Sequence, residues 1–278
     1  MPEPTIPPFY RRQFGAKLRR LRDKAGLTLD EAARRLEKTR SALNRIETGA
    51  TKADVHLVQS MMDLYDTHDP ELLDEARDAM KAPWYSKFGL ATEWYLDVET
   101  NAAQVRDFSP HVVPMLLQTE QYASALLARQ GHSARDNQVA ALKVRQQRLV
   151  DENDPLQLIT VVTEPGLRRM VNAPTVMHSQ LRSLVSSAQL PNVTLQVLPC
   201  ASDISAPATG GFTLGTMPDT TVPALLHVDH VAGSLDIEDP RMLASAYQTF
   251  EQLRAEALNP EESITVIEAL ALGLVGCR

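Results

Sequence analysis

The sequence predicts two domains: a mainly α N-terminal domain of about five short helices, and an α+β C-terminal domain with a mostly antiparallel sheet. The chain has 278 residues, 44% of them hydrophobic, which favours two cores over one. Short helical patterns fill residues 1–80, whereas extended segments rich in β-branched residues appear only in the second half. A stretch interrupted by Pro83 separates these patterns, so we expect a linker at 81–92 between domains 1–80 and 93–278.

Five amphipathic patterns predict the helices of the first domain. They cover residues 10–25, 29–37, 40–47, 53–65 and 70–80. Gly26 is typical of a residue that follows a helix end. Thr28 with Glu31 forms a capping-box pattern before the second helix. Thr39 is a suitable N-cap for the third helix, which Gly49 ends.

Helical and extended segments follow one another less regularly in the second domain. Helical patterns lie near 92–107, 118–130, 135–150, 174–188, 240–257 and 261–273. Extended segments lie at 156–164, 193–199, 211–217, 224–231 and 233–239. Only the first two extended segments are far enough apart for a helical crossover. Most strands are therefore expected to pair antiparallel.

Charge is distributed unevenly along the chain. The net charge is −7, but residues 1–52 hold 13 of the 28 basic residues and only 6 of the 35 acidic ones. This segment therefore carries +7, and the remainder carries −14. A basic segment ahead of an acidic body indicates that only the first domain meets an anionic partner. A chance accumulation of basic residues is the alternative.

Several classes of protein are not expected from this sequence. Cys200 and Cys277 form no disulfide framework and have no metal-ligand spacing. No apolar run is long enough for a membrane span and the N-terminus is not a signal peptide, so we expect a cytoplasmic, nucleoid-associated protein. No nucleophile elbow or phosphate-binding glycine loop is present, so neither an enzyme nor a cofactor is expected. His227 and Asp229 share one face of a predicted strand without a third metal ligand.

Residues 29–47 have the organisation of a helix-turn-helix motif, two helices joined by a three- to four-residue turn. Ala32 and Ala33 are small enough for the helices to cross closely. The apolar inner face of the second helix is supplied by Ala42, Leu43 and Ile46. The polar residues around them then face outward, where phosphates and base edges are reached: Thr39, Arg40, Ser41, Asn44 and Arg45.

The stretch LRRLRDKAGLTLDEAARRLEKTRSALNRIETG (18–49) resembles the phage-repressor or xenobiotic-response-element class of helix-turn-helix regulators. The resemblance implies base contacts from Arg40, Ser41 and Arg45, with Thr39 and Asn44 nearer the phosphates. It also implies a structural ion pair between Arg22 and Glu47.

This chain departs from the class at two places. Glu37 and Lys38 occupy the turn, which usually holds glycine and then an apolar residue, so the turn is expected to be strained or shaped differently. Leu29 stands where a polar residue normally contacts a phosphate. We therefore expect phosphate contacts from Thr28 and Lys38, with Arg11, Arg12 and Lys52 as further candidates.

EWYLDVETNAAQVRDFSPHVVPMLLQTEQYA (93–123) and TEPGLRRMV (163–171) are similar to a family of bacterial regulators often labelled antitoxin-like. The resemblance extends over 84–271 and departs from the family at Met115, where a glycine is usual. It implies a transcriptional regulator whose second domain receives a small protein encoded nearby. Because one short recognition helix reads few base pairs, we expect a homodimer on a double-stranded DNA operator.

Three residues of the second domain are candidates for contact with a ligand or partner: Gln118, Tyr122 and Arg168. The loop that contains Gln118 is either a packing motif or the floor of a binding site. Arg168 has the i,i+4 spacing for an ion pair with Glu164, or it binds a ligand carboxylate. The alternative function is thus a ligand-responsive transcription factor. A large apolar pocket would favour it, and a flat patch would favour a protein partner.

Overall fold

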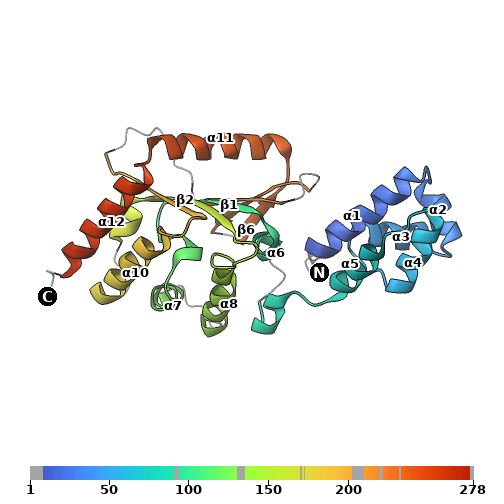
Figure 1. Ribbon diagram of the computed structural model, residues 1–278, viewed down its shortest axis with the longest axis horizontal. Helices are drawn as coiled ribbons and strands as arrows, with labels where there is room; N and C mark the ends of the chain where they lie inside the picture. Colours follow the sequence, from blue (N-terminus) through green and yellow to red (C-terminus); the bar gives the residue numbers. More distant parts are fainter. Residues whose placement is uncertain are drawn as a thin grey trace. The chain divides into compact units, whose positions relative to one another are not determined.

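The computed structural model describes residues 9–90, 94–129, 135–169, 171, 173–201, 210–218, 222–231 and 233–275. Cys277 and the end of the expected linker, 91–92, lie outside these ranges. The chain divides into two compact units, Met1–Asp97 and Val98–Arg278, and both can be followed in Figure 1. The linker itself stays a prediction.

Within the described part of the first unit, five α-helices confirm the predicted helical domain. They are α1 Phe9–Lys24, α2 Leu29–Arg35, α3 Arg40–Glu47, α4 Val55–Leu64 and α5 Pro70–Met80, and a 3-10 turn, η1, follows at Trp84–Phe88. Each helix from α2 to α5 begins at a polar side chain that accepts a hydrogen bond from a backbone N–H of the first turn: Thr28, Thr39, Asp54 and Asp69. Local capping therefore sets where these helices start.

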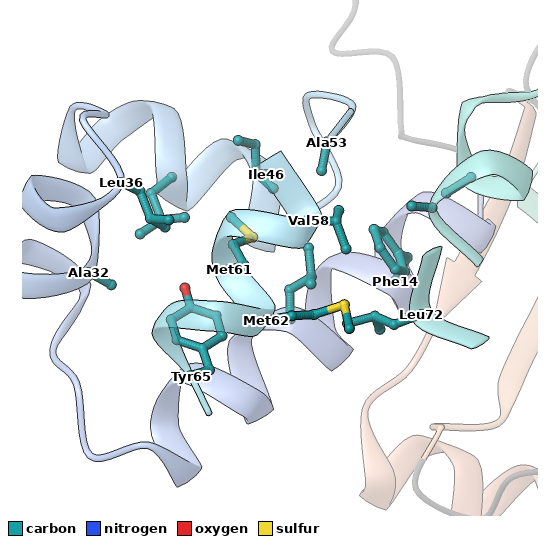
Figure 2. Close-up of a cluster of buried hydrophobic side chains, with 14 of the residues drawn as sticks. Phe14, Ala32, Leu36, Ile46, Ala53, Val58, Met61, Met62, Tyr65 and Leu72 are labelled. Carbon is teal, nitrogen blue, oxygen red and sulfur yellow. The ribbon is translucent and has the colours of Figure 1, made fainter. Parts of the chain in front are cut away.

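One hydrophobic core holds the five helices together (Figure 2). Leu18, Leu43, Val58, Met61 and Leu72 are at most 1% exposed, and they come from α1, α3, α4 and α5. Ala32 and Ala33 of α2 are also buried in this core, as expected where two helices cross closely. The motif is therefore part of a rigid packed unit.

Six strands form one sheet in the described part of the second unit. They are β1 Gln104–Ser109, β2 Gln157–Thr163, β3 Val193–Leu198, β4 Phe212–Thr216, β5 Leu225–His230 and β6 Gly233–Ile237. The order is β3-β2-β1-β4-β5-β6, with β1, β2 and β3 parallel and the other three pairs antiparallel. The sheet is thus mixed but mostly antiparallel, which confirms the predicted fold class.

Helices cover both faces of this sheet (Figure 1). The remaining described α-helices are α6 Trp94–Asn101, α7 Glu120–Arg129, α8 Arg135–Gln147, α9 Glu164–Arg168, α10 Pro174–Ser187, α11 Pro240–Glu256 and α12 Pro260–Val275, with a 3-10 turn, η2, at Met115–Leu117. Helix α11 packs Leu243, Phe250 and Leu253 on one face. Helices α7, α8 and α10 lie on the opposite side of the sheet in Figure 1.

The central strand β1 corrects the sequence prediction. The pattern predicts a helix over 92–107, which is wrong beyond Asn101, where α6 ends. The buried residues of β1, Val105 and Phe108, are three positions apart and imitate a helical stripe. Pairing with β2 and β4 on both sides satisfies the backbone of β1 as a strand, and this tertiary context overrides the local pattern.

Candidate nucleic-acid interface

The first helix of the motif, α2, begins with a complete capping box. The Thr28 hydroxyl accepts from the Glu31 N–H at 3.2 Å, and Glu31 Oε2 accepts from the Thr28 N–H at 2.9 Å and its hydroxyl at 2.7 Å. These bonds, chiefly the one from the Thr28 side chain, lower the pKa of Glu31. The N–H of Thr28 is thus bound to a carboxylate of the chain itself.

The turn after α2 adopts the left-handed geometry that glycine normally provides. Glu37 has a φ of +53°, although it is not glycine. Its N–H donates to the Arg34 carbonyl at 3.2 Å, and the Lys38 N–H donates to the Ala33 carbonyl at 2.8 Å. This pair of bonds is a Schellman motif. The turn expected to be strained therefore keeps the shape of a helix C-cap and places a non-glycine residue in a costly conformation.

Helix α3, the expected recognition helix, exposes its polar residues and buries its large apolar ones, with Glu47 as a buried exception. Its N-cap, Thr39, accepts from the Ala42 N–H at 3.1 Å. Leu43 and Ile46 are buried at 0% and 6% exposure. The residues expected at the DNA are exposed, and those within α3 span a sector of about 140° of the helix: Lys38, Thr39, Arg40, Ser41, Asn44 and Arg45. Arginine forks and asparagine amides are the groups that read base edges in a major groove.

A buried ion pair fixes the far end of α3. Arg22 Nε donates to Glu47 Oε1 at 2.7 Å, and Arg22 Nη2 donates to Glu47 Oε2 at 2.8 Å. Arg22 Nη1 also donates to the Leu27 carbonyl at 2.9 Å. The two side chains are 7% and 3% exposed, and hydrogen bonding to Glu47 raises the pKa of Arg22. Glu47 therefore faces the protein, and the bidentate pair ties α1 to α3.

Two glycines bring the backbones of α1 and α3 into direct contact. A Cβ atom on Gly15 would lie 2.5 Å from the Ile46 carbonyl oxygen. On Gly49, which has a φ of +74°, it would lie 2.7 Å from the Arg12 nitrogen. The sequence identified Gly49 as a helix end but did not predict the role of Gly15. A glycine inside an otherwise helical pattern was the available signal.

Two of the second-unit candidates are bound to the chain's own backbone. Gln118 Nε2 donates to the Val113 carbonyl at 2.8 Å, and the Tyr122 hydroxyl accepts from the Val113 N–H at 3.2 Å. Their exposures are 6% and 0%. Gln180 and Gln146 donate to further carbonyls of this loop, at Leu117, Leu116 and Gln118. Contact of Gln118 or Tyr122 with a ligand would require these bonds to open.

Arg168 lies at the rim of an apolar groove. Its Nε and Nη2 donate to Glu164 Oε1 at 2.9 and 2.6 Å, and 57% of its side chain is exposed. Hydrogen bonding from Arg168 lowers the pKa of Glu164. The groove measures about 490 Å³ and is lined mainly by α9, α10 and α12, with Leu167, Met177, Leu181, Val266 and Leu270 among its residues. A larger open hollow of about 1070 Å³ lies along α7 and α8.

Two known domain families match the chain. A helix-turn-helix domain matches residues 13–76. A domain of unknown function (DUF5753) matches residues 92–269. The chain belongs to the DUF5753 family. The helix-turn-helix domain ahead of the DUF5753 domain supports a DNA-binding transcriptional regulator.

A solved regulator structure is similar to part of the chain. The crystal structure of the clp gene regulator ClgR from C. glutamicum is 28% identical and covers 27% of this chain and 96% of its own, with a TM-score of 0.23. No curated protein matches the chain. Across the described residues, no helix is long and apolar enough to cross a membrane. The same described residues contain no group of three or more His, Cys, Asp or Glu side chains arranged to hold a metal ion.

A row of polar residues crosses the sheet of the DUF5753 domain. Asp107 on β1, Thr213 on β4, His227 on β5 and Asp236 on β6 are successive partners in register. His227 Nδ1 is 2.6 Å from Asp236 Oδ1, and its Nε2 is 3.4 Å from Asp229 Oδ1. Burial opposes the charged ring, but hydrogen bonds with the two carboxylates prevail and raise the pKa of His227 to about 9. The ring therefore carries its charge at neutral pH and joins β5 to β6.

Proposed function

We propose that this chain is a sequence-specific transcriptional regulator of the xenobiotic-response-element class, which binds operator DNA as a homodimer. The observation that carries the proposal is the exposed polar face of α3, which stands on a buried apolar face and is oriented by the Arg22–Glu47 pair. A single helix of this length reaches few base pairs, so two copies on two half-sites supply the remaining affinity.

The proposed contacts divide into base readers and phosphate contacts. Arg40, Ser41 and Arg45 would read base edges, because they project from the outer face of α3. Lys38, Thr39 and Asn44 would contact phosphates. Thr28 is the weakest of the phosphate candidates, since its N–H and hydroxyl are already bound to Glu31. Lys38, exposed in the turn, takes the larger share.

Removing Arg40 tests this assignment. Duplexes would first be selected from a random pool with the full wild-type chain, and the best duplex and a shuffled version would then be titrated by fluorescence anisotropy. Arg40→Ala is expected to reduce the preference for the selected duplex roughly 5- to 150-fold, the equivalent of one lost bidentate base contact.

The matched control is Arg77→Ala on α5, which also removes an exposed arginine that is paired with an aspartate. It should leave the preference unchanged at the same salt concentration. If Arg40→Ala behaves like this control, Arg40 is not a base reader. If the wild-type chain enriches no duplex at all, the proposed function is wrong.

For the DUF5753 domain we propose that it receives a small protein partner and thereby changes operator affinity. Such an effect requires different affinities of the partner for two arrangements of the regulator. A small-molecule ligand is the second candidate. The groove beside Arg168 favours it, since about 490 Å³ lies within the usual range of ligand sites and its lining is mostly apolar.

Two measurements separate these candidates. Native mass spectrometry of the purified chain would reveal a retained small molecule, and Arg168→Ala should then release it. Co-purification with the small protein encoded next to this chain, followed by an operator-binding titration of the complex, tests the partner. A complex that forms without altering operator affinity would contradict control by that partner.

A further inference from the structure

The exposed side of the motif carries two carboxylates close to the proposed DNA contacts. Asp30 and Glu31 are the second and third residues of α2. Glu31 is bound to Thr28, as described above. Asp30 instead reaches the recognition helix: its Oδ2 lies 3.5 Å from Nε of Arg40, the first residue of α3. Both side chains of the Asp30–Arg40 pair are mostly exposed, at 63% for Asp30 and 70% for Arg40.

We propose that Asp30 is a specificity-determining residue of the DNA interface. It positions the Arg40 side chain for a base contact, and its charge weakens binding to DNA of every sequence. This inference rests on the proposed binding of DNA by α3. It adds a role for a residue that itself contacts neither base nor phosphate.

The positioning effect follows from the geometry of the guanidinium group. Asp30 approaches the Nε atom of Arg40 and leaves the Nη groups to donate to a base edge. An exposed ion pair of this kind is weak, so it does not lock the side chain. It does restrict the arginine before DNA arrives, which reduces the conformational entropy lost when the base contact forms.

The repulsive effect follows from charge. The phosphate backbone supplies most of the affinity for non-specific DNA, and this term does not depend on sequence. A carboxylate beside the recognition helix lowers that affinity for every sequence, because phosphates pass within the screening length at moderate salt. This repulsion alone leaves the ratio of specific to non-specific affinity unchanged. The ratio rises because the positioning effect strengthens only those complexes in which Arg40 binds a base.

The test compares Asp30→Asn with Asp74→Asn in the full chain. Asp74 on α5 is paired with Arg77 at 2.5 Å, so both substitutions remove one negative charge from an exposed aspartate–arginine pair. Titrations would use the selected and shuffled duplexes described above, at two salt concentrations. Asp30→Asn is expected to bind the shuffled duplex roughly three-fold more tightly and to reduce the specificity ratio roughly two- to five-fold. Asp74→Asn should change neither value beyond about 1.5-fold, because its charge lies outside the proposed interface.

A double-mutant cycle with Arg40→Ala separates the two effects. In that background, Asp30→Asn should still tighten binding to the shuffled duplex, but it should no longer change the specificity ratio through Arg40. Thermal unfolding of each variant shows whether the domain is intact. Asp30→Glu keeps the negative charge. It should therefore bind the shuffled duplex as weakly as the wild type does, unlike Asp30→Asn.

Three results would overturn the inference while leaving DNA recognition by α3 in place. The first is an Asp30→Asn variant that behaves like Asp74→Asn. The second is tighter binding to both duplexes with an unchanged ratio. The third is an equal loss of specificity with and without Arg40. A wild-type chain without any preferred duplex would instead refute the proposed function.

Discussion

The two units of this chain use buried ion pairs for different purposes. In the helix-turn-helix domain, the Arg22–Glu47 pair orients a helix whose outer face is polar and exposed. In the DUF5753 domain, Arg145 forms a bidentate pair with Glu99 at 2.5 and 2.7 Å, and these side chains are 8% and 3% exposed. Arg145 Nη1 also lies against the Met115 sulfur. This second pair anchors the loop around Met115, where the ligand candidates Gln118 and Tyr122 are buried and bound to the chain's own backbone.

The difference shows which kind of functional surface can be predicted from the sequence. The proposed DNA surface is built from two consecutive helices, so its residues lie close together in the sequence. The polar row of the DUF5753 domain joins strands that are neighbours in the sheet but far apart in the sequence. Asp107 accepts hydrogen bonds from Thr160 and Thr213, which lie 53 and 106 residues away along the chain. Burial, opposed by these bonds, raises the pKa of Asp107.

The largest effect is expected from Arg22→Ala. Removing one partner of a buried ion pair leaves Glu47 as an uncompensated charge, which should cost the first unit about 3–5 kcal/mol. Hydrogen exchange of the α1–α5 amides would measure this loss separately from the second unit. Arg19→Ala is the control, because the pair that Arg19 forms with Asp23 at 3.7 Å is exposed. Equal protection in the two variants would remove the structural role given to the Arg22–Glu47 pair.

A smaller, pH-dependent effect is expected in the sheet. The pKa of His227 is about 9 in the fold and 6.5 without it, so the charged ring adds stability that is complete below pH 6.5 and lost as the pH rises through 9. The shift corresponds to at most about 3 kcal/mol. Urea midpoints between pH 6 and 10 should fall for the wild type and less for His227→Gln. The exposed His56→Gln should follow the wild type, and an equal slope in all three chains would contradict the role of His227.

A gain of about 1 kcal/mol is expected from Glu37→Gly, because glycine adopts the left-handed conformation of this turn without steric strain. Gly26→Ala provides the opposite comparison. Gly26 has a φ of +71° and open space around its Cβ position, so alanine should lose a similar amount through backbone strain alone. Thermal unfolding midpoints would measure both changes. A destabilised Glu37→Gly variant would show that the Glu37 side chain contributes more than its backbone conformation costs.

The smallest effect is expected from Arg168→Ala. Arg168 is exposed, although its partner Glu164 is only 18% exposed, and an i,i+4 pair of this kind contributes about 0.5 kcal/mol. The urea midpoint should therefore barely move. The variant therefore suits the ligand experiment described above, since any loss of a bound molecule would not reflect unfolding. A loss of several kcal/mol would show that Arg168 supports the fold and is unsuitable as a probe of the groove.

Local patterns predicted the helices of the first unit to within a few residues. Thr28, Thr39 and Asp54 cap helices through bonds that span three residues, and such bonds can be read from adjacent positions. The exposed polar face of α3 followed from the same periodicity. The Asp30–Arg40 pair and the close contact at Gly15 were not predicted. Both depend on how α1, α2 and α3 pack against one another, and the hydrophobic pattern of a single helix does not specify that packing.

In the DUF5753 domain, the order and type of most elements also followed from hydrophobic periodicity and turn residues. The strand β1 did not, because its neighbours β2 and β4 supply the hydrogen bonds that make a strand of it. The sequence also did not predict that Gln118 and Tyr122 form hydrogen bonds with the backbone of Val113, because these contacts depend on how the loop packs. Caps, helical faces and charge segregation are short-range properties of the chain. Sheet order, buried polar partners and the crossing of helices depend on contacts between distant residues, and only the folded chain brings these together.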